Sequence, residues 1–159
     1  MSETVWLGGL GVVFKVTGEE TGGAFAVVEH PIEPGVLVPP HRHEREDELT
    51  YVIEGEIGAR VGEREVALTA GEYLWKPRGV PHAFWNASSA PARISDLIVP
   101  AGFERFFSEL AELLARGAST EEIAEAGRRY GHHLVDGWIE DLERRHRVRV
   151  RSVARVLYG

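Results

Sequence analysis

Two histidines at positions 41 and 43 have the spacing that lets a β-strand point both side chains at one ion. Side chains two positions apart project from the same face of a strand, so His41 and His43 face one way and Arg42 the other. Their Cα atoms would lie roughly 6.5 Å apart, close enough for both imidazoles to bind one metal ion at about 2.1 Å. Pro39 and Pro40 stiffen the preceding chain and lower the entropy lost when the pair is held in place.

A carboxylate and a third imidazole can complete this set. Glu48 opens an apolar segment directly after a charged turn, residues 44–47, and a hairpin through that turn would return Glu48 beside the two histidines. Pro81 fixes the backbone just before His82, which can enter from a different strand. We therefore predict four metal ligands, namely His41, His43, Glu48 and His82.

Other polar residues compete for this role or stand apart from it. Glu46 and Asp47 are alternative carboxylate ligands, but the run 44–47 is too charged to be buried and indicates a solvated turn. Lys76 and Arg78 are interpreted as surface charges, with attraction of an anionic substrate as the alternative. Solvated or capping roles are predicted for the histidines without paired ligand spacing, which are His30, His132, His133 and His146.

Short segments rich in β-branched and aromatic residues, separated by Gly or Pro, fill the first hundred residues. Regular spacing of this kind without intervening helices favours an antiparallel sandwich or barrel. On the strand that begins at His82, Phe84 shares the histidine's face, where it is either a core residue or part of an aromatic-ligand pocket. The predicted strands are 12–16, 25–29, 48–54, 57–61, 73–76, 82–85 and 94–99.

The pattern changes to helical after Pro100. One apolar stripe at three- and four-residue steps predicts a helix over 103–116 that stops at Gly117. Ser119 and Glu122 have capping-box spacing and open a second helix that ends near Gly131. Asp136 is predicted to cap a third helix, and 147–151 alternates like a short strand. The stripe consists of Phe103, Phe106, Phe107, Leu110, Leu113 and Leu114.

The segments 35–55 and 71–86 resemble the two motifs of the cupin superfamily. The first motif is matched by Gly35, His41, His43, Glu48 and Gly55, and the second by Gly71, Pro77, Gly79, His82 and Asn86. More weakly, residues 5–135 resemble small bacterial cupins often described as quercetin-dioxygenase-like. The resemblance implies an all-β jelly-roll barrel over 1–102, with the metal site within 35–86 and a substrate cavity at one end. We expect 103–159 to form a helical C-terminal extension packed on the barrel, either across its mouth or on its outer face, rather than an independent domain.

The donor set and the resemblance together suggest a function. Nitrogen and oxygen ligands without sulfur suit one divalent transition-metal ion, either Fe, Mn, Ni, Co, Cu or Zn. By analogy with the family, we expect a dioxygenase-like oxidoreductase acting on a small phenolic or enol/diketone-type molecule, with Glu48 both a ligand and an acceptor of the substrate's hydroxyl proton. A non-redox isomerase, cyclase or lyase and a non-enzymatic binding module remain alternatives.

Composition sets the expected partners. The net charge is −7, with all 25 acidic residues before position 144 and six arginines and no acid from there on. The acidic body argues against nucleic-acid binding, and the basic tail is expected to fold back on it. The absence of cysteine, of an apparent secretory signal and of a membrane-length apolar run fits a cytoplasmic protein. Large outward apolar groups predict a homodimer, chief among them Tyr51, Ile53 and Trp85.

Overall fold

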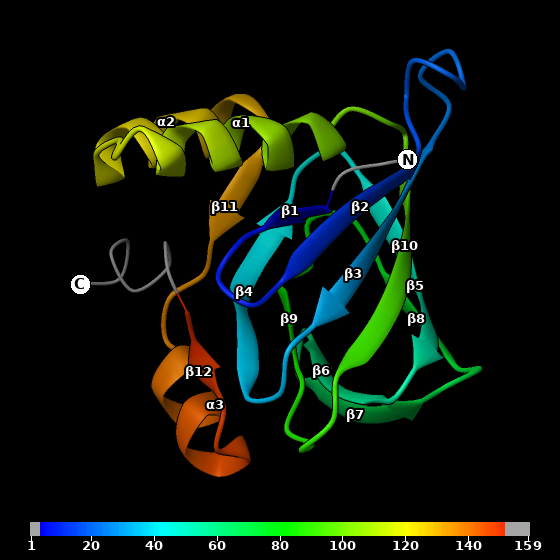
Figure 1. Cartoon of the computed structure of the whole chain (residues 1–159), viewed down its shortest axis with the longest axis vertical. Helices are drawn as coiled ribbons and strands as arrows, with labels where there is room; N and C mark the ends of the chain where they lie inside the picture. Colours follow the sequence, from blue (N-terminus) through cyan, green and yellow to red (C-terminus); the bar gives the residue numbers. More distant parts are fainter. Residues whose placement is uncertain (1–3, 152–159) are drawn as a thin grey trace.

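Two antiparallel sheets face each other in the computed structural model, which describes residues 4–151 (Figure 1). The first sheet has the strand order β1-β2-β3-β10-β5-β8, and the second has the order β11-β4-β9-β6-β7, with β12 pairing parallel to β4. The strands are β1 (Thr4–Trp6), β2 (Gly11–Val16), β3 (Ala26–Ile32), β4 (Val36–His43), β5 (Asp47–Glu54), β6 (Glu56–Val61), β7 (Arg64–Thr69), β8 (Tyr73–Lys76), β9 (His82–Trp85), β10 (Ala92–Val99), β11 (His132–Leu134) and β12 (Arg149–Val150).

The barrel interior is layered along its strands. On β10, Ile94 packs in one apolar cluster between the sheets, and Ile98 packs in a second cluster beneath the helices. Asp96 lies between them on the same face, since side chains alternate along a strand. β3 repeats the pattern, with His30 between Ile32 and Val28. A polar layer therefore separates two apolar cores inside the barrel.

Three helices follow the barrel strands. They are α1 (Glu104–Ala115), α2 (Thr120–Arg129) and α3 (Ile139–His146). Figure 1 shows α1 and α2 lying across one end of the barrel and α3 near the opposite end, beside β12. The predicted capping box is confirmed, because Ser119 accepts from the Glu122 backbone N–H and the Glu122 carboxylate accepts from the Ser119 N–H. No helix in the described part of the chain is long and apolar enough to cross a membrane.

The apolar stripe of α1 packs against the barrel, as its spacing in the sequence predicts. Phe103, Phe106 and Leu113 are buried against Val12 and Ile98 of the first sheet, together with residues of α2. Gly117 follows α1 with φ of 68°, a left-handed conformation that glycine adopts without steric cost. The extension thus packs on the barrel through the face that its sequence pattern defined.

Several sequence predictions need correction. Trp85 projects from the outer face of β9, as predicted, but it is not exposed there: it is 3% exposed, packs with α3 residues and stacks on the His146 ring at 4.4 Å. The third helix begins after Trp138, not at Asp136. Strands β1, β7 and β11 were not predicted. The charged residues Arg64 and Glu65 open β7, and β11 has only three residues.

The basic tail folds back in part on the acidic body. Arg151 donates to the Glu33 carboxylate at 2.7 Å, and Arg145 pairs with Glu65. The remainder of the predicted tail, 152–159, lies outside the described residues. These pairs are partly exposed, so each contributes little to the free energy of unfolding.

Candidate metal centre and its cavity

Strand register brings the four predicted ligands together. β4 and β9 pair so that His41 lies directly opposite His82, after a bulge between Val38 and His41. His43 follows two residues later on the same face, and Glu48 enters from β5 of the other sheet. Residues directly opposite each other in a sheet share a face, so the pairing converts two separate sequence motifs into one cluster.

The cluster has the donor set and spacing of a metal site. One ligand atom from each of His41, His43, Glu48 and His82 lies within 4.8 Å of the others, and all four side chains are buried. His43 Nε2 is 2.8 Å from Glu48 Oε1, and His82 Nε2 is 3.5 Å from the same oxygen. If all four atoms bound one ion at about 2.1 Å, the widest spacing between them would shorten slightly.

Unpaired polar atoms support a metal at this place. Both ring nitrogens of His43 and of His82, and Oε1 of Glu48, are buried without a well-formed hydrogen bond. Buried polar atoms without partners are costly, and native proteins rarely leave several together. His41 is oriented differently, because its Nδ1 lies 2.7 Å from the Pro39 carbonyl, which leaves Nε2 as the ligand nitrogen. The residues fit one divalent transition-metal ion without sulfur ligands.

The electrostatic environment favours the neutral form of His41 and His82 and the ionised form of Glu48. Burial, and next the neighbouring His43, lower the pKa of His41 to about 3. Burial and the His41 ring likewise hold the pKa of His82 well below its ordinary value. Burial opposes the ionisation of Glu48, but the Lys76 ammonium and the His43 ring outweigh it and place the pKa of this carboxyl well below its usual range. Neutral imidazole and carboxylate are the forms that bind metal.

Lys76 is not the predicted surface charge: it is 3% exposed and lies inside the barrel. It stands directly opposite Glu48 across the β5–β8 pair, so both side chains share the interior face. Its Nζ is 3.8 Å from Glu48 Oε2 and 3.3 Å from Asp96 Oδ1. Burial disfavours the ammonium, but Asp96 and Glu48 raise the pKa of Lys76. Arg78, in contrast, is an exposed partner of Asp47, as predicted for a surface charge.

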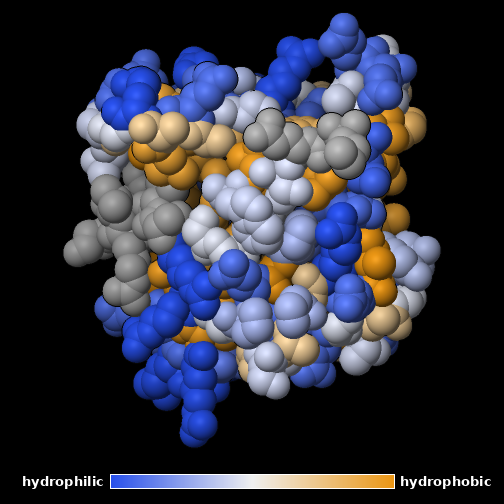
Figure 2. Space-filling view, in the orientation of Figure 1, coloured by the Kyte–Doolittle hydropathy of each residue, from blue (hydrophilic) through white to orange (hydrophobic). Residues whose placement is uncertain are grey.

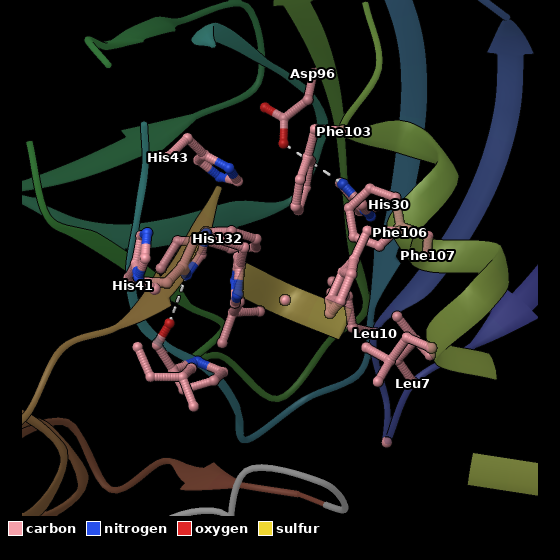
Figure 3. A pocket seen from close by; sticks show the side chains of 18 of the residues that line it. Leu7, Leu10, His30, His41, His43, Asp96, Phe103, Phe106, Phe107 and His132 are labelled. Carbon is pink, nitrogen blue, oxygen red and sulfur yellow. Dashed lines mark hydrogen bonds and ion pairs between the residues drawn. The ribbon is translucent and has the colours of Figure 1, made fainter. Parts of the chain in front are cut away.

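His30 continues this buried chain, contrary to the solvated role predicted for it. Its Nδ1 lies 2.8 Å from the Gly11 carbonyl, and its Nε2 lies 3.5 Å from Asp96 Oδ2. Asp96 also accepts a hydrogen bond from Thr50, which stands opposite it in the β5–β10 pairing. Charged and polar groups therefore run in contact from Glu48 through Lys76 and Asp96 to His30. Figure 3 shows the contact between Asp96 and His30.

A cavity of about 310 Å³ opens beside the cluster. The barrel lines one side with predicted ligands, the buried charges and Phe84, which belongs to the apolar core and also borders the cavity. The extension lines the other side, and Figure 3 shows three phenylalanine rings of this wall facing the histidines. The residues that region 103–115 and α2 contribute to this wall include Phe103, Phe106, Phe107, Leu110 and Ile123.

His132 is a cavity residue that the sequence reasoning placed in solvent. Burial, and next the His41 and His43 rings, hold the pKa of His132 well below its ordinary value. Its ring centroid is 4.9 Å from that of His41 and 5.7 Å from that of His43. No ligand spacing precedes it, and β11 is three residues long, so the sequence held little signal for this position. His133 and His146 match their predicted partly exposed roles, pairing with Glu44 and Glu65.

Glu46 also departs from its prediction. The turn 44–47 is not fully solvated, because Glu46 is 5% exposed and its Oε2 lies 3.9 Å from His43 Nδ1. Burial raises the pKa of this carboxyl. It lies outside the four-residue cluster, so the preference for Glu48 as the carboxylate ligand agrees with the geometry.

The two-sheet barrel and its buried cluster of three histidines and one glutamate can be compared with known protein families. The family described as "Cupin domain" matches residues 28–100. Residues 28–100 therefore match a cupin domain, and the two antiparallel sheets form the cupin double-stranded β-helix. An RmlC-like cupin from Shewanella frigidimarina has the same fold, with a TM-score of 0.54, 24% identity, and coverage of 64% of this chain and 86% of that one.

Two curated proteins are similar in sequence. Tetracenomycin polyketide synthase protein TcmJ of Streptomyces glaucescens is 36% identical over 80 residues, which are 50% of this chain and 52% of TcmJ. Quercetin 2,3-dioxygenase of Bacillus subtilis is 29% identical over 94 residues, which are 59% of this chain and 28% of that enzyme. The chain thus spans about half of one relative and about a quarter of the other.

Proposed function

We propose that this protein is a metal-dependent, dioxygenase-like oxidoreductase acting on a small phenolic or enol/diketone-type molecule. The observation that carries the proposal is the position of the His₃Glu cluster at the edge of a cavity of about 310 Å³ with an aromatic opposite wall. Ligand pockets of this size typically combine apolar walls with a few fixed polar groups. A flat, conjugated molecule with adjacent oxygens matches both features.

Each group has a distinct task in this proposal. The bound metal would supply a Lewis acid for the ligand's oxygens and a route for electrons to dioxygen. Glu48 accepts the proton of the ligand's hydroxyl as that oxygen becomes an enolate or phenolate. Lys76 holds the second oxygen of the Glu48 carboxylate, which keeps Oε1 directed at the histidines. The phenylalanines exclude water, which strengthens these electrostatic interactions.

The similarity to quercetin 2,3-dioxygenase supports dioxygen chemistry, and the similarity to a polyketide synthase protein supports a second candidate. Polyketide chains are rich in 1,3-diketone and phenol groups, which the same cluster could bind and deprotonate. In that case Glu48 would catalyse a non-redox cyclisation or isomerisation without consuming dioxygen. Both candidates share the ligand class and differ in whether dioxygen is consumed.

Oxygen uptake separates the two candidates. Protein freed of metal and reloaded in turn with Fe, Mn, Co, Ni, Cu or Zn is supplied with quercetin and with pentane-2,4-dione. We expect dioxygen consumption matched to substrate loss for at least one metal, and its loss in Glu48→Gln. His146→Gln, which alters a histidine outside the cavity, serves as the matched control. Turnover that proceeds equally without dioxygen would reject the oxidoreductase in favour of non-redox chemistry. Binding of neither compound with any metal would contradict the ligand class itself.

A further inference from the structure

We infer that His132, contributed by the C-terminal extension, is a ligand-binding residue of this site that donates a hydrogen bond to an oxygen of the metal-bound molecule. This inference rests on the proposed function, since it concerns the same cavity. It names a fourth imidazole, distinct from the four-residue cluster, and assigns to it the recognition of an oxygen-donor ligand. The contacts of β11 and of the surrounding rings carry it.

Strand pairing places the His132 side chain inside the barrel. β11 adds to the edge of the second sheet, antiparallel to β4, with His132 directly opposite His43 and Leu134 opposite His41. Directly opposite residues share a face, so His132 points to the same interior as the predicted ligands. His133 stands opposite Arg42 and projects from the other face. A three-residue strand outside the matched cupin domain, 28–100, thus completes the wall of the site.

Aromatic rings fix the His132 imidazole in one orientation. It stacks on Phe103 at 5.6 Å with 15° between ring planes and on Phe106 at 5.2 Å with 24°. Gly127 of α2 allows this close packing, because a Cβ there would lie 3.3 Å from the His132 carbonyl and 3.5 Å from its Nδ1. A ring held in this way loses little further freedom when it binds a ligand.

The ring nitrogens of His132 are available to a ligand. Within residues 4–151, the contacts of this side chain are ring contacts, and no hydrogen bond to another described residue uses its nitrogens. The residue lines the cavity, where Figure 3 shows it between His41 and the phenylalanines. Every other histidine in the chain has a polar partner or belongs to the cluster. A neutral imidazole always carries one N–H, so His132 can donate.

The position of His132 suits a ligand atom bound beside the cluster and not the metal itself. It does not belong to the set of ligand atoms that lie within 4.8 Å of one another. Its ring centroid nevertheless lies only 4.9 Å from that of His41 and 5.7 Å from that of His43, so it is a direct neighbour of two of the predicted ligands. An oxygen held on the ion would lie within hydrogen-bond reach of such a group. Enolate and phenolate oxygens are strong acceptors, so this hydrogen bond would be charge-assisted.

The test compares metal binding with ligand binding in full-length Zn(II)-loaded protein, using the chromophoric catechol 4-nitrocatechol as the probe. His132→Phe preserves the ring stacking and removes the donor, whereas His132→Gln restores an N–H at similar reach. His146→Phe is the matched control, because it makes the same change at a stacked histidine outside the cavity. Zinc affinity is measured by competition with a chelator, and nitrocatechol affinity by its absorbance change.

We expect the nitrocatechol dissociation constant to rise about tenfold or more in His132→Phe, to return towards wild type in His132→Gln and to be unchanged in His146→Phe. Zinc affinity should be unchanged in all three. Equal nitrocatechol affinity in His132→Phe and wild type would overturn the inference and leave the proposed function intact. Loss of zinc affinity in His132→Phe would also overturn it, by making His132 a metal ligand. Failure of wild-type protein to bind nitrocatechol would contradict the proposed function and the inference together.

Discussion

The two walls of the cavity differ in origin and in chemistry. The barrel wall carries the three predicted ligand histidines and the buried charges of Glu48, Lys76 and Asp96, each fixed by strand register. The wall from the extension consists mainly of aromatic and aliphatic side chains, and its polar members include His132, His133 and Arg128. The barrel thus supplies all four predicted ligands, while the extension encloses the space beside them, where we propose that it restricts what can bind.

Removal of one barrel imidazole should have the largest effect. His82→Ala should lower metal affinity on the order of a thousandfold, because a four-ligand site loses one of its neutral donors. Competition titration with a chromophoric chelator measures it. His146→Ala, a histidine outside the cavity, should bind metal like wild type. Wild-type affinity in His82→Ala would mean that the barrel wall is not the metal-binding wall.

Acid should destabilise the metal-free protein, in part through His41 of the barrel wall. The pKa of His41 is about 3 in the folded metal-free protein and about 6.5 when unfolded. The unfolded state therefore binds more protons between these values, and the free energy of unfolding falls as the pH drops from about 6.5 towards 3. The loss should reach a few kcal/mol in urea titrations of metal-free protein. His41→Gln should show a shallower dependence on pH, and an identical slope would contradict the assignment.

Substitutions in the wall formed by the extension should lower the free energy of unfolding without changing metal affinity. Phe106→Ala removes a buried ring between α1, Tyr130 and the His132 ring. It should lower the free energy of unfolding by about 3 kcal/mol, as expected for a large core truncation. Urea unfolding measures this, with Phe25→Ala as the control at a ring 37% exposed. Metal affinity should stay at the wild-type level, and a parallel loss would show that the two walls are not separable.

The smallest effect concerns the outer face of the barrel. Tyr73 and Trp75 are 63% and 53% exposed on β8, an edge strand, and Ile53 of the paired β5 is 37% exposed. Figure 2 shows apolar groups along the edge where Figure 1 places β5 and β8, and hydrophilic groups over α3. We predict a homodimer through this face.

Light scattering tests the dimer. Trp75→Lys should give a monomer with unchanged metal affinity, and Trp6→Lys, an exposed tryptophan on β1 at the far edge of the same sheet, should stay dimeric. A wild-type monomer at micromolar concentration would refute the prediction. The tryptophan variants leave both walls of the cavity untouched, so a change in metal binding would also count against this separation of roles.

The sequence predicted the barrel wall better than the extension wall for a physical reason. His41 and His43 are two residues apart in one strand, and Glu48 and His82 sit at fixed offsets within local motifs. Seven predicted strands and the capping box at Ser119 likewise depend on local patterns, and the structure contains them all. Information of this kind is contained within a few neighbouring residues.

The missed residues depend on pairing between distant segments. His132 enters the site only because β11 pairs with β4, about 90 residues away in sequence. Lys76 is buried because its charge is met by Asp96 and Glu48, which no local pattern connects to it. One signal was available for Lys76, since it alternates with Leu74 on a strand whose other face holds Tyr73 and Trp75. Strand 73–76 was predicted correctly, but Lys76 was assigned to its solvent-exposed face and lies on its buried face.

The metal content of protein purified without chelators tests the central claim most directly. Elemental analysis by mass spectrometry should find about one transition-metal ion per chain in wild type. It should find almost none in the double variant His41→Ala/His82→Ala, provided that circular dichroism shows this variant to be folded. Metal-free wild-type protein that also fails to take up Fe, Mn, Co, Ni, Cu or Zn, or full metal retention in the folded double variant, would contradict the account.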